Sequence, residues 1–551
     1  MMAPTHRTWW ETGKSVLLVV LVALSLILTW LSWNYRPPYR AAEKQYTAMP
    51  PLGEEEELEH VVIPELIVFH RSGEHRLALP FTPAYRKTLD TLSQWPVSAL
   101  TPVTWEEMDW RAMRRGTGME LNYGIPVPLV DLPWFDPADG TAPADVTVHR
   151  VWLVDETVSV PGDGDPDDGA GRAWDGKPAA GALVLYLLDD ERQQAYRAPL
   201  ETEAAGWKTL LESAADLPLG VFYPTESGTS AGRAADDGSA AADRLSASAL
   251  ETSSAGSGHV AVEHSGVQNG ERADEDGAGE AAGSHVPVLE TGPGVDGLDA
   301  PGRDGAPFGW YLPHEAPLVD EEVWQWEPIP LSSLYPYLFV DPTYIREIVT
   351  RDGVLVYTDG SRSLQVEPSR WRMIYDAPAF LPPSGREADD MSPIRTAVQF
   401  INQYGGWIGQ YGLDGVRQFT SDHVRLLFRY YHGLYPVYAS IPGGEDARME
   451  FSTQTAGTVT TLERPFYRLA KKIQAVERRL PDGEAVYRQV LDLQAQGRNI
   501  LRIRLAYRME MAMDTPEGES PVIHLVPDWV LVDADGRFDW LQATVRPAGD
   551  D

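Results

Sequence analysis

The most constraining feature of the chain is an uncharged apolar stretch near its N-terminus, Ser15 to Trp33 (SVLLVVLVALSLILTWLSW). A run of about 18 or more apolar residues is long enough for a helix to cross the hydrocarbon of a bilayer, at about 1.5 Å per residue. Trp9, Trp10 and Trp30 lie near its two ends, which suits the membrane interfaces where amphipathic rings settle. We therefore expect residues 15–33 to form a single transmembrane signal anchor.

Two alternatives to an anchor are a buried helix of a soluble protein and a cleaved signal peptide. A buried helix normally carries a polar face. A signal peptide has a shorter apolar run and a small-residue cleavage site, whereas this run continues into Asn34-Tyr35-Arg36-Pro37-Pro38. Basic residues lie on both sides of the run, so charge does not decide the topology. The short tail 1–14 favours a cytoplasmic N-terminus and a large extracytoplasmic body, and the absence of cysteine agrees with this.

The composition excludes one large class of partner. The net charge is −35, and binding to nucleic acid phosphates requires clustered Lys and Arg. We therefore expect no nucleic acid partner. With 43% hydrophobic and 10% aromatic residues, the remainder of the chain can fill the cores of about three domains of ordinary size.

One internal segment, 224–307, differs in kind from the rest. It contains no Phe, Tyr or Trp, is dominated by Gly, Ala, Ser, Asp and Glu, and carries a net charge of −11. Such a composition buries too little apolar surface to offset the conformational entropy lost on folding. We predict a disordered acidic insert, with Tyr223 and Phe308 on either side of it belonging to neighbouring parts of one folded body.

The remaining patterns predict an α+β body of antiparallel sheets with covering helices. Apolar runs on both sides of Ser72-Gly73-Glu74 indicate a β-hairpin. Helices are predicted at 393–404, with Ala397, Phe400 and Ile401 on one face, and at 482–493. Each is followed by strand patterns, a plan that suggests an internal helix-plus-meander duplication. The predicted segments after the anchor are a juxtamembrane linker (34–59), a β-rich α+β N-terminal domain (60–223), the insert (224–307), a middle domain (308–390) and a C-terminal α+β domain (391–551).

The sequence offers only fragments of catalytic or metal-binding patterns. It contains no Gly-x-Ser-x-Gly, His-Glu-x-x-His or Walker motif. His70 and His75 flank the predicted turn at a spacing that we do not expect to place both imidazoles on one face, and no third ligand has a recognisable spacing. The acidic segment 161–178 begins like a calcium loop, but Asp168 and Trp174 occupy the positions that require Gly and Glu. We predict no catalytic residue, no metal site and no cofactor.

Five stretches, taken in order, resemble the YycH family. They are the anchor with its aromatic-Arg-Pro flank (SVLLVVLVALSLILTWLSWNYRPPY), LFVDPTYIREI followed by VYTDGSR, FINQYGGW, VRLLFRYYHGLYPVY and LVPDWVLVDADG. The resemblance runs collinearly from about residue 13 to residue 545. Segments 161–178 and 224–307 depart from the family pattern, so the resemblance says nothing about them.

The resemblance implies a membrane-anchored accessory protein of the WalK (YycG) type of sensor histidine kinase, which governs cell-wall metabolism in Gram-positive bacteria. It implies a non-catalytic extracytoplasmic body that acts through contacts within and beside the membrane. It also implies a second accessory protein, YycI, whose extracellular fold is related to the C-terminal part of this chain. Two alternatives to kinase regulation remain: an extracytoplasmic protein that binds a cell-wall ligand, and a cell-wall hydrolase.

The predicted anchor also carries a candidate partner-binding face. Ser25, Thr29 and Ser32 are spaced by four and three residues, so their hydroxyl groups share one stripe of a helix. Small and hydroxyl side chains let membrane helices pack closely and hydrogen-bond, for about 0.6 to 2 kcal/mol per bond. Each hydroxyl can instead bond the carbonyl one turn back. Our hypothesis is that this stripe faces the kinase.

Overall fold

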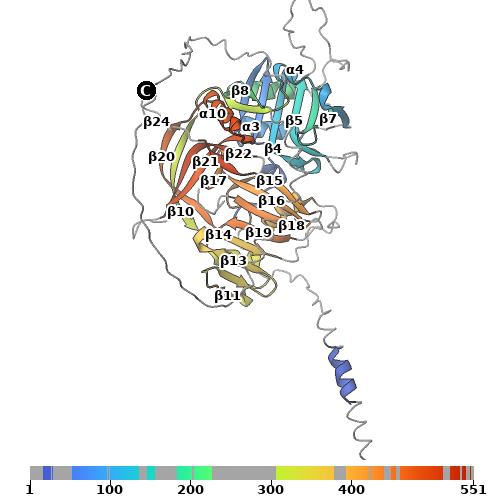
Figure 1. Cartoon of the computed structure of the whole chain (residues 1–551), viewed down its shortest axis with the longest axis vertical. Coiled ribbons are helices and arrows are strands. Elements are labelled where there is room, and N and C mark those ends of the chain that lie inside the picture. Colours follow the sequence, from blue (N-terminus) through green and yellow to red (C-terminus); the bar gives the residue numbers. More distant parts are fainter. Residues whose placement is uncertain are drawn as a thin grey trace, which may run out of the picture.

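The computed structural model describes residues 17–26, 28, 52–95, 97, 100–135, 146–155, 183–200, 204–225, 306–377, 392–420, 423–439, 448–454, 459–512, 521–533, 536–541 and 546–547. Within the predicted anchor, residues 17–26 are helical (blue in Figure 1). No helix in the described part of the chain is both long enough and apolar enough to cross a membrane. The predicted tail 1–14, the calcium-like segment 161–178 and all of the insert between residues 226 and 305 lie outside the described residues.

Two antiparallel sheets make up the body, and the predicted α+β class is confirmed (Figure 1). The first sheet has nine strands in the order β3-β7-β6-β5-β4-β1-β2-β8-β9. Its strands are β1 Leu66–Arg71, β2 Glu74–Ala78, β3 Thr101–Thr104, β4 Thr117–Pro128, β5 Thr147–Asp155, β6 Leu183–Asp189, β7 Gln194–Leu200, β8 Leu219–Pro224 and β9 Gly309–Pro313.

The second sheet has 15 strands, with a main path of β11-β12-β13-β14-β19-β18-β16-β17-β21-β22-β10-β20-β24 and with β15 and β23 paired to β16 and β22. One pairing in it, β17 with β21, is parallel. Its strands are β10 Leu318–Pro328, β11 Arg346–Val349, β12 Leu355–Thr358, β13 Ser363–Glu367, β14 Arg372–Asp376, β15 Gln410–Thr420, β16 His423–His432, β17 Tyr435–Ala439, β18 Arg448–Gln454, β19 Val459–Pro465, β20 Tyr467–Arg479, β21 Ile500–Ala512, β22 Val522–Asp533, β23 Phe538–Trp540 and β24 Arg546–Pro547.

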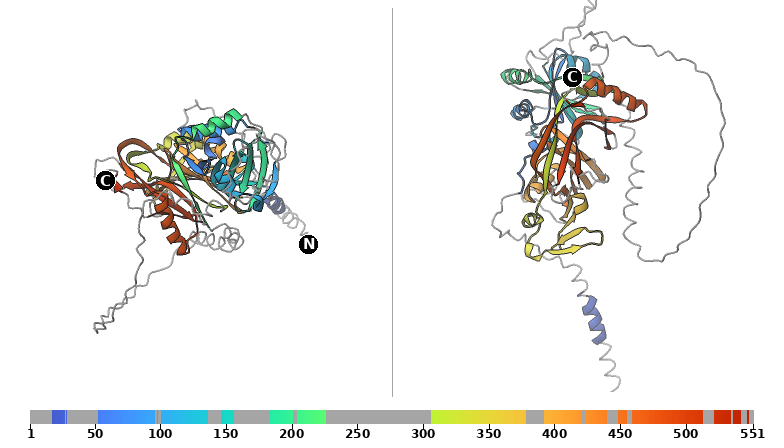
Figure 2. Two further views of the ribbon diagram at one scale, coloured as in Figure 1. Left: turned by 90° about the horizontal axis from the view of Figure 1, so that it is seen from above. Right: turned by 90° about the vertical axis from the view of Figure 1, so that its left-hand side faces the viewer.

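Short helices cover these sheets. They are α2 Leu58–Val61, α3 Pro83–Leu92, α4 Trp110–Arg115, α5 Ala204–Ser213, α8 Leu331–Leu338, α9 Pro393–Gln403 and α10 Gly483–Ala495. The Ser392 hydroxyl caps α9 by accepting a hydrogen bond from the backbone N–H of Arg395. The predicted apolar face of this helix, Ala397, Phe400 and Ile401, is buried. Figure 2 shows α10 beside the first sheet, and its Val486 packs there on Leu312 of β9.

Two local predictions about strand pairing are confirmed. Strands β1 and β2 form the expected hairpin, and Ser72 and Gly73 adopt φ values of 52° and 84°, as a two-residue type I′ turn requires. Strands β8 and β9 pair with Tyr223 opposite Trp310. Residues on the two sides of the acidic insert are therefore neighbours in one sheet.

The predicted middle segment, 308–390, contributes strands to both sheets. Strand β9 closes the first sheet, whereas β10 pairs with β20 and β22 of the second. Strand β14 continues into the C-terminal part by pairing with β19. The largest apolar core likewise includes Leu121 of the first sheet and Phe451 of the second, so the two sheets share one core.

The C-terminal part contains the two helix-plus-strand units that the sequence suggests. Helix α9 precedes β15, β16 and β17, which pair antiparallel in chain order. Helix α10 precedes β21, β22 and β23, which pair in the same way. The first described residues after the predicted anchor, 52–65, meet both units.

Candidate functional site

The end of the predicted linker is bound to the connection between α9 and β15, and we call residues 52–65 the incoming segment. The backbone N–H of Gly53 donates to Gly405 O at 3.0 Å, and that of Glu54 donates to Trp407 O at 3.1 Å. The N–H of Trp407 donates back to Glu54 O at 2.8 Å. Residues 53 and 54 are therefore joined to the C-terminal part of the body, although the strand that follows them in sequence, β1, belongs to the first sheet.

The side chain of Asn402, near the end of α9, completes this attachment. Its Oδ1 accepts the Glu56 backbone N–H at 3.0 Å, and its Nδ2 donates to Glu56 O at 2.8 Å. The same Oδ1 accepts the Trp407 indole N–H at 2.8 Å. One amide thus holds two backbone groups of the incoming segment and the buried indole. We call Gly53, Glu54, Glu56, Asn402 and residues 405–407 the clamp.

Two glycines make the close approach in the clamp sterically allowed. A Cβ on Gly53 would lie 2.2 Å from Trp407 O. A Cβ on Gly406 would lie 2.6 Å from Gly53 O, and Gly406 has a φ of +77°. Both distances are far below van der Waals contact, and positive φ favours glycine. Asn402 and residues 405–407 of the clamp belong to FINQYGGW, one of the stretches that resemble the YycH family.

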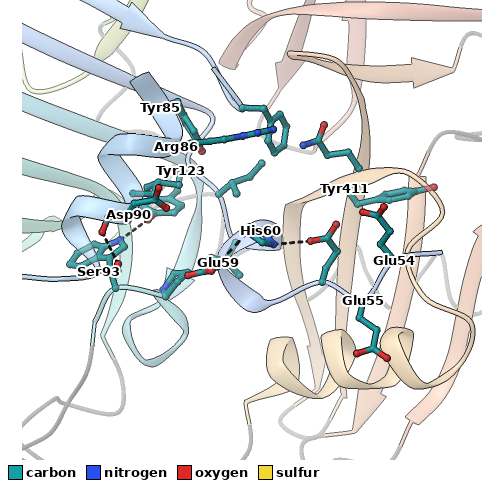
Figure 3. Close-up of a pocket in the computed structure, with 18 residues that line it drawn as sticks. Glu54, Glu55, Glu59, His60, Tyr85, Arg86, Asp90, Ser93, Tyr123 and Tyr411 are labelled. Atoms are coloured by element: carbon teal, nitrogen blue, oxygen red, sulfur yellow. Dashed lines mark hydrogen bonds and ion pairs between the residues drawn. The ribbon is translucent and has the colours of Figure 1, made fainter. Parts of the chain in front are cut away.

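A cavity of about 450 Å³ opens beside the clamp (Figure 3). Carboxylates of the incoming segment line it, and His60 Nδ1 lies 2.9 Å from Glu56 Oε2. The other wall is aromatic: burial raises the pKa of Tyr85 and Tyr123, so both phenols stay neutral, and Tyr85 OH donates to Pro64 O at 2.6 Å. In the described part of the chain, no three His, Cys, Asp or Glu residues are arranged to hold a metal ion.

A buried ionic cluster forms a second attachment next to the clamp. Glu65 Oε1 lies 2.7 Å from Arg502 Nη1 of β21 and also contacts Arg504. Asp414 of β15 pairs with Arg504 at 2.8 Å and with Arg429 of β16 at 2.9 Å. Burial alone would raise the pKa of Asp414, but the guanidinium groups of Arg429, Arg502 and Arg504 hold it well below its usual range. Residues 52–65 therefore contact both helix-plus-strand units.

Of the three predicted partner-binding residues, only one belongs to the described part of the chain. Ser25 belongs to the helix at 17–26. Thr29 and Ser32 lie outside the described residues. The role of these three residues therefore stays a prediction, and the clamp is a site that the sequence patterns alone did not predict.

The expectation for the histidine pair is wrong. His70 and His75 are cross-strand partners in the β1–β2 hairpin, and their Nδ1 atoms lie 2.9 Å apart. The two-residue turn makes residues equidistant from it face each other, which puts both imidazoles on one side of the sheet. His70 is stacked on Trp152, and burial lowers its pKa, with smaller effects from His75 and Arg114. The pair is a buried part of the first sheet.

Comparisons with known proteins match both ends of the chain. Residues 11–131 match the family model described as YycH protein, N-terminal domain, and residues 309–547 match the model described as YycH protein, C-terminal domain.

One curated relative and one solved structure agree with these matches. The "Two-component system WalR/WalK regulatory protein YycH" of Bacillus subtilis is 23% identical over 231 residues, which are 41% of this chain and 49% of the relative. The match thus spans about half the length of that relative. The crystal structure of YycH from Bacillus subtilis aligns with a TM-score of 0.54 at 14% identity, covering 89% of this chain and 99% of that one. Because the two family models together match more than half of the chain, it belongs to the YycH family.

Proposed function

We propose that this protein is a non-catalytic, membrane-anchored regulator of a WalK (YycG) type sensor histidine kinase that controls cell-wall metabolism. Membership of the YycH family carries the proposal, together with a Bacillus subtilis relative that is named as a WalR/WalK regulatory protein. We place the body outside the cytoplasm of a Gram-positive bacterium and residues 15–33 in the membrane. A YycI-like protein is the proposed companion.

The clamp supports a mechanical part of this proposal. Backbone hydrogen bonds tie residues 53 and 54 to the α9–β15 connection, and Glu65 contacts β21. A partner that displaces either helix-plus-strand unit would therefore displace the segment leading to the anchor. A ligand shifts a two-state equilibrium only through its different affinity for the two states. The clamp provides a physical route by which binding to the body can reach the membrane helix.

Within the membrane, we propose that Ser25, Thr29 and Ser32 face the kinase. The chain contains no cysteine, so single-cysteine variants at these positions can be crosslinked to the kinase without background. Val20, Ile27 and Leu31 are the matched control positions, because 100° per residue places them on the opposite face of a helix. We expect strong adducts at the first three positions and weak ones at the controls. Equal adducts at all six would reject the proposed face.

The alternatives involving the cell wall can be tested with purified full-length protein in detergent. A hydrolase would release soluble fragments from purified peptidoglycan. A wall-ligand receptor would gain thermal stability with such fragments by mass action. We expect neither result. Release of fragments would favour a hydrolase over a kinase regulator, and a gain in thermal stability would favour a receptor for a wall ligand.

A further inference from the structure

A second cavity, of about 800 Å³, lies between the two sheets. One wall includes β9, which pairs with β8 on one side only within the described part of the chain. The opposite wall includes the first half of β21. In the described residues, β17 covers β21 only at Tyr507–Met509, so residues 500–506 pair with β22 alone. The indole N–H of Trp310 donates to Leu501 O at 3.0 Å and ties the two strand edges together at one point.

Part of the lining of this cavity is apolar and exposed. Leu219, Leu318 and Leu501 line it and remain 38%, 49% and 43% exposed. Large apolar side chains that gather at one exposed place indicate an interaction site more often than isolated ones do. An occupant with apolar groups would remove all three leucines from water.

The arginines in the cavity wall are already paired with carboxylates of the protein. Arg150 makes a bidentate contact with Asp190, and Arg502 pairs with Glu65. Arg504 pairs with Asp414, and Arg76 Nη2 lies 3.6 Å from Glu74 Oε2. The arginines therefore do not form an open anion site, and the occupant best suited to these walls carries no net charge.

We infer that this cavity binds an extended, uncharged, apolar segment of a partner polypeptide, which adds as a strand to the free edge of β21. An unpaired strand edge offers backbone donors and acceptors that a polypeptide satisfies and a hydrocarbon chain cannot. Residues 500–506 provide an edge of about 20 Å at about 3.3 Å per residue, enough for about six residues of an added strand. The inference concerns the body alone and does not depend on the proposed role of the membrane helix.

The test uses the full-length protein and a library of hexapeptides with Val, Leu, Ile or Phe at alternate positions and Thr or Ser between them. Hydrogen exchange of the amides at 500–506 is followed with and without each peptide, and dissociation constants are measured for members that slow it. Backbone N-methylated versions of the same peptides keep the side chains but remove the strand donors. Laurate serves as the probe for a hydrocarbon occupant.

We expect at least one peptide to slow exchange along 500–506, and its N-methylated version to bind at least about tenfold more weakly. Leu501→Asp should weaken binding by a similar factor, whereas Leu491→Asp, at a leucine that is also 43% exposed but belongs to α10, should not. Binding that ignores N-methylation, protection by laurate but by no peptide, or no protection by any probe would each overturn the inference.

Discussion

Gly53 and Gly406 approach each other so closely in the clamp that one added methyl group would separate the two backbones. We predict that Gly406→Ala destabilises the protein by about 1 to 3 kcal/mol more than Gly353→Ala. Gly353 is a matched control, because its φ of +80° resembles the +77° of Gly406 but nothing lies within 4 Å of its Cβ position. Denaturant unfolding of both variants measures the difference. Equal costs would show that only the backbone angle matters and that the close contact is unimportant.

Asp528 in β22 is a buried carboxylate whose protonation affects stability. Its Oδ1 accepts the backbone N–H of Trp529 at 2.8 Å, and Arg508 Nη1 lies 3.6 Å from its Oδ2. Burial raises the pKa of Asp528 to about 6, against an ordinary value of 3.8. The folded state binds the carboxyl proton of Asp528 more tightly than the unfolded state does. The stability that this proton contributes is therefore complete below about pH 4 and is lost as the pH rises through about 6.

We therefore predict that Asp528→Asn flattens the dependence of stability on pH between 4 and 7. Relative to the wild type, the variant should gain about 2 to 3 kcal/mol over this interval, since one pKa unit corresponds to about 1.4 kcal/mol. Urea unfolding at several pH values measures the gain. Asp539→Asn, which removes an exposed carboxylate from β23, is the control. A gain of the same size in the control, or none in Asp528→Asn, would contradict the prediction.

At the scale of elements, the ionic cluster joins the incoming segment to β15, β16 and β21. We predict that Asp414→Asn destabilises the protein by about 3 to 5 kcal/mol, because it leaves the buried guanidinium group of Arg429 without a carboxylate partner. Glu327→Gln, which breaks the exposed pair with Arg468, should cost at most about 1 kcal/mol. Chemical denaturation compares the two variants, and a similar cost for both would refute a buried role for the cluster.

The same cluster predicts a loss of stability in acid. The pKa of Asp414 is held below its ordinary value of 3.8 by three arginines. The stability that the Asp414 carboxylate contributes is therefore complete above about pH 4 and is lost as the pH falls towards the lower pKa of the folded state. When the pH is lowered below about 4, the urea midpoint of unfolding should decrease more steeply for the wild type than for Asp414→Asn. Parallel curves for the two proteins would contradict this cause.

Sequence patterns predicted the elements that short-range chemistry decides. The hairpin follows from the turn at Ser72-Gly73, and α9 follows from the apolar spacing of Ala397, Phe400 and Ile401. The expectation that Tyr223 and Phe308 belong to neighbouring parts of one body followed from the abrupt changes of composition at the two ends of the insert. In each case neighbouring residues carry enough information to specify the local structure.

The sequence did not predict the features that depend on long-range register. One missed contact is local: His70 lies opposite His75 because the turn has two residues, whereas the predicted turn, Ser72-Gly73-Glu74, has three. The clamp joins Gly53 to Gly406, and the ionic cluster joins Glu65 to Arg502, across most of the chain length. Because these contacts arise from the order of strands in two sheets, periodicity in the sequence does not reveal them.

At the scale of the whole molecule, the clamp and the ionic cluster link residues 52–65, which follow the predicted anchor in the sequence, to both helix-plus-strand units. In our proposal, the kinase meets the anchor within the membrane and a companion protein meets the body. The segment 52–65 then carries displacements between these two places. Replacing residues 15–33 should therefore separate recognition of the kinase from the folding of the body.

The decisive measurement is the amount of sensor kinase that co-purifies with the full-length protein from membranes, compared with a version whose residues 15–33 are replaced by an unrelated membrane span. We predict clear recovery of the kinase with the native protein and at least about a tenfold loss with the replaced span, while the thermal unfolding of the body is unchanged. Recovery of the kinase with the native protein that does not exceed that of an unrelated membrane-anchored protein would contradict kinase regulation. Equal recovery with both spans would contradict recognition through the membrane helix.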